Sequence, residues 1–120
     1  MLFRSDREEL RTEMTAELSR LEDYSAEIGK MIAGEGIEAK EENVVSRMAA
    51  KMGMSMNTMM DSTTNHIAEM MMEGYTMGIA DMTKDIREYE NTTVSEASLK
   101  LARDIVNYYE RCYDRMKKFL

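Results

Sequence analysis

Apolar residues recur along the chain at intervals of three and four, the spacing that gives an α-helix one apolar side. Residues 5–8, Ser-Asp-Arg-Glu, have the spacing of a capping box, so the first helix is predicted to begin at about residue 6. Gly34 and Gly36 are predicted to end it, because glycine adopts the left-handed C-cap conformation at little cost. The apolar side of this helix is formed by Leu10, Met14, Leu18, Leu21, Ile28 and Ile32, with Tyr24 and Met31 beside them.

A second helical stretch is predicted over residues 38–90. Glycine weakens a helix interior, so Gly53 is one place where this stretch can break, and Gly74 with Gly78 is another. The sequence leaves open whether these residues form one helix or two.

A turn at residues 91–93 separates this stretch from the last helix, which is predicted over residues 94–119 with Thr93 or Ser95 as its N-cap. The chain has no proline, which permits long helices, and strand-like alternation is nearly absent. The predicted fold is therefore all-α, an up-and-down antiparallel bundle of three long helices, or of four if the middle stretch breaks. The last helix places one apolar stripe inward, consisting of Leu101, Ile105, Tyr108, Cys112 and Phe119.

Length and charge narrow the function classes. A chain of 120 residues is long enough for one domain with its own core, so a single domain over residues 1–120 is predicted. The net charge of −7 repels phosphate backbones and makes nucleic-acid binding improbable. No apolar run approaches the roughly 20 residues that a membrane-spanning helix needs. The start lacks the regions of a signal peptide and Cys112 is the one cysteine, so a cytoplasmic location is expected.

The middle stretch is rich in methionine: eleven of the fifteen methionines lie between Met48 and Met82. On one continuous helix, steps of three and four residues would align many of them in a single stripe. That stripe consists of Met48, Met52, Met56, Met59, Thr63, His66, Met70, Glu73 and Met77. A second stripe begins later, on the opposite side of such a helix, and consists of Ala68, Met72, Tyr75, Ile79, Met82, Ile86 and Tyr89.

One interpretation of the first stripe is a site for a soft metal ion. Thioether sulfur and imidazole nitrogen suit Cu(I) or Ag(I), and thioethers carry no proton at physiological pH. His66 and Met70 are one helical turn apart, so one face can offer two donors. The candidate ligands of this stripe are His66, Met70, Met59, Met56, Met52 and Met77.

The alternative interpretation needs no metal. The apolar side of the chain changes from the first stripe to the second near Gly74 and Gly78, and the methionines form an adaptable core or the interface of a homo-oligomer. Both sides are apolar between residues 68 and 77, which indicates deep burial or contact with a second copy or another helical protein. In this interpretation His66 is a hydrogen-bonded core residue.

The residues of two catalytic sites are missing. A carboxylate di-iron centre needs two Glu-x-x-His pairs, whereas His66 is the one histidine and Thr63 precedes it by three residues. Cys112 lies on the inward stripe of the last helix with no histidine nearby in sequence, so it is predicted to be a small buried apolar residue. We therefore expect no enzymatic activity.

Two segments resemble a known family. Residues 69–82, Glu-Met-Met-Met-Glu-Gly-Tyr-Thr-Met-Gly-Ile-Ala-Asp-Met, are similar to the pattern M-M-I-P-H-H-x-x-A-I-[DE]-M. Residues 101–106 and 116–120 resemble the closing pattern L-A-x-x-I-I…M-x-x-W-L. Both patterns are typical of the ferritin-like family of small Met/His-rich helical proteins that includes the CopM-type copper and silver binders.

The resemblance implies a ferritin-like bundle and adds Met71, Met72 and Met82 to the candidate ligands. The chain departs from the family where Gly74, Tyr75 and Thr76 stand in place of a proline and two histidines. The resemblance therefore supports the fold more than the chemistry.

Overall fold

The computed structural model describes residues 5–35, 44–59, 62–92 and 94–120, and their regular structure is entirely helical. The all-α class is therefore confirmed, and the described chain has four helices rather than three. They are α1 (Asp6–Glu35), α2 (Val44–Asn57), α3 (Thr64–Tyr89) and α4 (Glu96–Met116), and a short 3₁₀ turn, η2 (Lys117–Phe119), follows α4.

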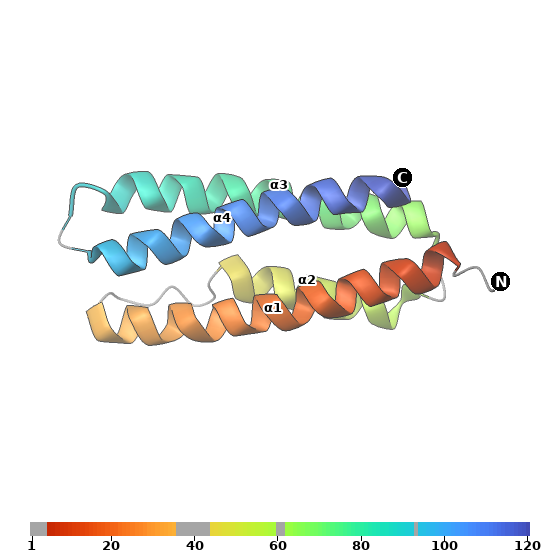
Figure 1. Ribbon diagram of the computed structural model, residues 1–120, viewed down its shortest axis with the longest axis horizontal. Coiled ribbons are helices and arrows are strands. Elements are labelled where there is room, and N and C mark those ends of the chain that lie inside the picture. Colours follow the sequence, from red (N-terminus) through yellow and green to blue (C-terminus); the bar gives the residue numbers. More distant parts are fainter. Residues whose placement is uncertain (1–4, 36–43, 60–61, 93) are drawn as a thin grey trace.

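The helices lie side by side along the long axis of the molecule, and each runs antiparallel to the next (Figure 1). Ion pairs join neighbouring helices at matching heights: Arg47 to Asp81 between α2 and α3, and Arg103 to Glu90 between α3 and α4. At one end, the Arg7 guanidinium donates to the backbone oxygens of Met59 and Ser62, 3.0 and 3.2 Å away. This pair of bonds fixes the start of α1 against the connection between α2 and α3.

Hydroxyl caps set the starts of three helices. The Ser5 hydroxyl accepts from the backbone N–H of Glu8, which confirms the predicted start of the first helix at residue 6. The Ser95 hydroxyl accepts from the N–H of Ser98 at 3.2 Å, so Ser95 is the N-cap of α4. The Thr63 hydroxyl accepts from the N–H of His66 at 3.2 Å and caps α3. Each cap satisfies a donor that the first helical turn leaves unpaired.

The middle stretch divides at a place that the glycines did not indicate. The predicted break at Gly53 is wrong, because this residue lies within α2, and Gly74 and Gly78 lie within α3. The division falls between Asn57 and Thr64, where the Thr63 cap outweighs the weak helix propensity of the glycines. The first helix ends at Glu35, so Gly34 lies within α1 and does not end it. Gly36, the expected start of the next helix and Thr93 lie outside the described residues.

The core is built from apolar side chains of all four helices. Tyr75 and Tyr109 are its largest fully buried members, and their rings pack edge to face with centroids 5.1 Å apart. The Tyr109 ring also lies against Gly78, where an added Cβ would be only 2.3 Å from Cε2. The other buried apolar residues include Leu10, Met14, Leu21, Val45, Met48, Met52, Ile67, Met71, Ile105 and Met116.

Two helical glycines, Gly53 and Gly78, permit a matched test of this packing. Gly78→Ala should lower the free energy of unfolding by about 1–3 kcal/mol, because the new methyl group overlaps a ring that cannot leave the core. Gly53→Ala should raise it by about 0.5–1 kcal/mol, because nothing lies within 4 Å of its Cβ position and alanine is the better helix former. Denaturant unfolding of both variants measures the difference. Equal effects would contradict the close approach of Tyr109 to α3.

Candidate functional site

The continuous stripe of methionines does not exist. Helix α2 ends at Asn57 and α3 begins at Thr64, so the two parts of the predicted stripe lie on separate helices. On α3 the core is formed by the side that carries the second stripe, through Ala68, Tyr75 and Ile86. His66 and Met77, which belong to the first stripe, lie on the exposed side of the same helix. The prediction of a single shared edge is therefore wrong.

The nine candidate ligands fall into three groups by exposure. The imidazole of His66 is exposed, so His66 is not the hydrogen-bonded core residue of the metal-free interpretation, nor does it lie inside among thioethers. Four of the eight candidate methionines are instead buried in the core, which is where the metal-free interpretation places methionines. The buried candidates are Met52, Met59, Met71 and Met82; the half-buried ones are Met56, Met70 and Met72; the exposed ones are His66 and Met77.

Histidine, cysteine and carboxylate side chains offer no alternative metal centre. In the described part of the chain, no three or more of them are placed to hold one ion.

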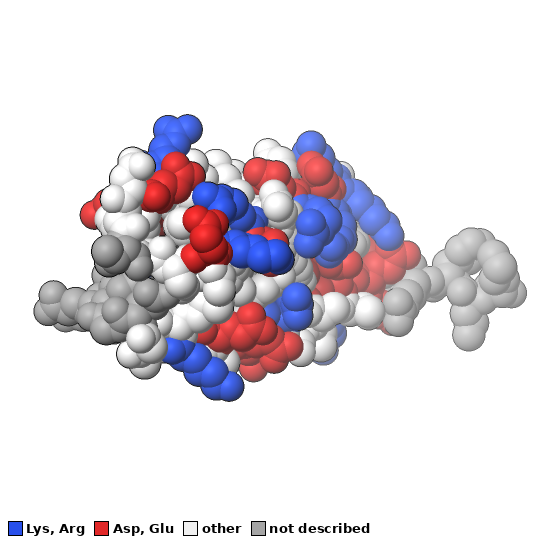
Figure 2. Space-filling view, turned by 60° about the vertical axis from the view of Figure 1, so that its left-hand side comes forward, with Lys and Arg blue, Asp and Glu red and all other residues white. Residues whose placement is uncertain are grey.

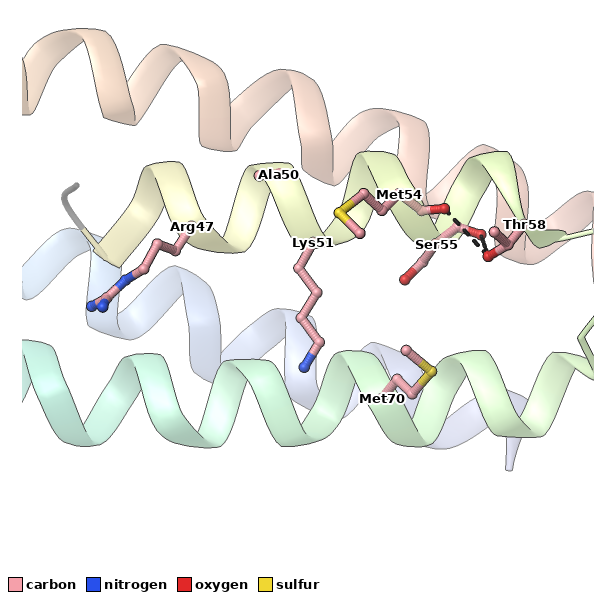
Figure 3. Close-up of a pocket in the computed structure, with 7 residues that line it drawn as sticks. All are labelled: Arg47, Ala50, Lys51, Met54, Ser55, Thr58 and Met70. Carbon is pink, nitrogen blue, oxygen red and sulfur yellow. Dashed lines mark hydrogen bonds between the residues drawn. The ribbon is translucent and has the colours of Figure 1, made fainter. Parts of the chain in front are cut away.

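A groove between α2 and α3 brings Met70 of α3 close to side chains of α2 that were not part of the predicted stripe. It has a volume of about 350 Å³ and is lined by Arg47, Ala50, Lys51, Met54, Ser55, Thr58 and Met70. Lys51 extends from α2 toward α3, and Met70 extends from α3 toward α2 (Figure 3). We call this the α2–α3 groove.

The outer surface beside this groove exposes methionine. Met54 of α2 is 69% exposed and Met77 of α3 is 64% exposed, and both are large apolar side chains. Met70 is half-buried and lies two helical turns before Met77, on the same side of α3. We call Met54, Met70 and Met77 the methionine face.

Lys51 crosses the groove because α3 has a glycine at that height. A Cβ on Gly74 would lie 2.9 Å from the Met48 sulfur and 3.4 Å from the Lys51 Nζ. The absence of a side chain therefore lets the ammonium group rest on α3. Arg47, at the rim, has a carboxylate partner in Asp81 at 3.8 Å, but Lys51 forms no ion pair with any other described residue.

Acidic and basic side chains are mixed over the rest of the visible surface. Figure 2 shows Lys and Arg beside Asp and Glu over the face that it presents, with no broad area of one sign. The face that Figure 2 presents therefore has no extended basic patch of the kind that attracts a nucleic acid.

A second feature lies inside the helices, where a carboxyl group is completely buried. Glu17 of α1 is 0% exposed, and its Oε1 accepts a hydrogen bond of 2.5 Å from the Tyr75 hydroxyl of α3. Its Oε2 is buried and has no hydrogen-bond partner. The Tyr109 hydroxyl is also buried without a partner.

Burial decides the protonation of this cluster. Desolvation, and then the neighbouring Glu13 carboxyl, raise the pKa of Glu17 from 4.5 to about 9, so its carboxyl is neutral at pH 7. Burial also raises the pKa of the Cys112 thiol to about 12 and the pKa of Tyr75. All three groups hold their protons in the folded protein.

Sequence reasoning missed Glu17, although its spacing could have identified it. Glu17 follows Met14 by three residues and precedes Leu21 by four, which places it on the apolar side of α1. Met54 and Lys51 were also missed, because they lie outside the stripe that a continuous helix would form.

The comparisons with known proteins add no relative. No family model, no curated protein and no solved structure matches the chain. Among the described residues, no helix is long and apolar enough to cross a membrane.

The buried carboxyl predicts a pH-dependent stability. Below pH 4.5 Glu17 is protonated in both states, whereas between pH 4.5 and about 9 only the unfolded chain has released this proton. The free energy of unfolding therefore falls as the pH rises, by up to about 1.4 kcal/mol per pH unit from this group. Glu17→Gln should remove that slope and exceed the wild type in stability at pH 7–8, by on the order of 3 kcal/mol.

Urea unfolding of both proteins from pH 5 to 8.5 measures this slope. The exposed Glu22 lies on the same helix, so Glu22→Gln controls for loss of a carboxylate and should keep the wild-type slope. A Glu17→Gln variant that is as sensitive to pH as the wild type would show that Glu17 ionises freely in the folded protein.

Proposed function

We propose that this chain is a non-enzymatic helical protein that self-associates, and that the methionine face is its interface. The observation that carries the proposal is the exposure of Met54 and Met77 beside the α2–α3 groove, on a molecule whose other methionines are largely buried. Large exposed apolar side chains next to a groove are typical of an interaction surface.

The chemistry of methionine suits this role. Its unbranched thioether side chain adapts to irregular partners, and Met-rich grooves accept the apolar side of a helix in other systems. Met70 anchors the face, because it packs against the core from α3 while lining the groove. A second molecule would therefore contact one methionine held by the core, Met70, and two exposed methionines with flexible side chains, Met54 and Met77.

A non-enzymatic role agrees with the state of the best candidate nucleophile. Cys112 is 0% exposed, and burial raises the pKa of its thiol to about 12. Thiolate is the nucleophilic form, so this group is unreactive at pH 7. The single cysteine is also the reason to propose a cytoplasmic location.

The four antiparallel helices agree with a ferritin-like bundle, and we retain that relationship as part of the proposal.

Self-association is tested by removing the exposed thioethers. The double variant Met54→Gln/Met77→Gln should shift an oligomeric wild type toward monomer, because it replaces apolar contact area with amide groups that lose water on association. Size-exclusion chromatography with light scattering over a concentration series measures this shift. Leu120→Gln is the matched control, because Leu120 is 59% exposed and lies outside the methionine face. A wild type that stays monomeric throughout would contradict the proposal.

A second candidate function is the binding of Cu(I) or Ag(I) at the same surface. It is favoured by two thioethers from different helices, Met54 and Met70, that line one groove, and by the exposed His66 one turn before Met70. Sulfur and imidazole are ligands that soft ions accept. The buried candidates, such as Met52 and Met71, fill the core and are not needed for this site.

Metal binding is tested by titrating Cu(I) under reducing conditions against a competing chelator. His66→Ala/Met70→Leu should weaken the affinity at least about tenfold, since losing even a residue that only orients a metal ligand typically weakens binding about tenfold or more. Met82→Leu, at a buried candidate, should leave the affinity unchanged. Equal uptake by wild type and double variant would exclude this site.

A further inference from the structure

Two charged residues beside the methionine face have no partner in the described part of the chain. Lys51 on α2 is half-buried, and its ammonium group rests over Gly74. Glu73 on α3 is exposed and forms no ion pair or hydrogen bond with any other described side chain. Both groups are therefore available to a molecule that covers the face.

Lys51 and Glu73 are placed so that a two-fold contact between two copies can pair them. Glu73 falls between Met70 and Met77 at steps of three and four, on their side of α3, whereas Lys51 comes from α2 and lines the groove with Met54. The face thus has a cation on one helix, a carboxylate on the next, and thioethers beside both. A two-fold rotation lays α2 of one molecule over α3 of another, which brings opposite charges together twice.

We infer that the partner at the methionine face is a second copy of this chain, docked about a two-fold axis with Lys51 of each copy facing Glu73 of the other. This inference rests on the proposed self-association and specifies its geometry. An acidic helix from another protein would neutralise Lys51 but would repel Glu73, whereas a second copy satisfies both charges. The thioethers form the apolar centre, and the two ion pairs fix the register.

Charge exchange tests this arrangement. Lys51→Glu alone places two carboxylates opposite each other at both contacts, and Glu73→Lys alone places two cations there. Each variant should raise the dimer dissociation constant about tenfold or more at low salt. An equimolar mixture of the two should restore the wild-type constant, because every contact in the mixed dimer then joins opposite charges. The double variant Lys51→Glu/Glu73→Lys should also restore it.

Arg11→Glu and Glu110→Lys are the matched controls, because they change the net charge equally at exposed positions on α1 and α4. They should leave the constant unchanged, and sedimentation equilibrium measures all of these proteins. A dimeric wild type whose single variants bind as tightly, or are not rescued by mixing, overturns the two-fold geometry while self-association stands. A wild type that is monomeric at every concentration overturns both.

Discussion

The Thr63 cap is the constraint on which the surface of this protein depends. By accepting the N–H of His66, Thr63 starts α3 afresh after the interruption that follows α2, and so fixes the direction of every side chain on α3. With that start, Tyr75 points into the core and Met77 points to solvent. On one unbroken helix from residue 48 onward, the methionines of the two parts would have shared an edge. Because α2 and α3 are separate helices, each has its own buried methionine, such as Met52 or Met71, and its own exposed one, Met54 or Met77.

The same orientation of α3 explains the buried polar cluster. Tyr75 can reach Glu17 across the core only because its side of α3 faces α1, and the hydrogen bond between them leaves the second carboxyl oxygen unpartnered. A charged carboxylate at this place would be very costly, so the group remains protonated. A buried acid is weak evidence for stability, since the unfolded chain gains by releasing the proton. Its position among close-packed tyrosines is instead consistent with a role in specifying how α1 and α3 pack.

The sequence predicted local features well and long-range ones poorly. The start of α1 after Ser5 followed from a capping residue next to periodic apolar positions, and Ser95, the N-cap of α4, was one of the two predicted caps. The break between Asn57 and Thr64 did not follow in this way, because its signal, a threonine before an ordinary helical run, is weaker than the signal of the glycines at 53, 74 and 78. Those glycines serve packing: Gly78 accommodates the Tyr109 ring and Gly74 the Lys51 side chain. Contacts between residues so distant in sequence leave no local pattern. The groove was unpredictable for the same reason, since it joins Lys51 and Met54 to Met70 across two helices.

The two functions proposed for the methionine face use the same thioethers. A second copy seated over Met54 and Met70 would cover the thioethers that Cu(I) or Ag(I) requires, and an ion held by them would stand between the two molecules. If both ligands bind the same surface, each must weaken the other by linkage, since each stabilises only the state that it occupies. The buried methionines take no part in this competition, because neither an ion nor a second copy reaches Met52 or Met71 without opening the core. His66, Glu73 and Met77 lie together on the exposed side of α3. A second copy and a metal ion would therefore compete for this side of the helix.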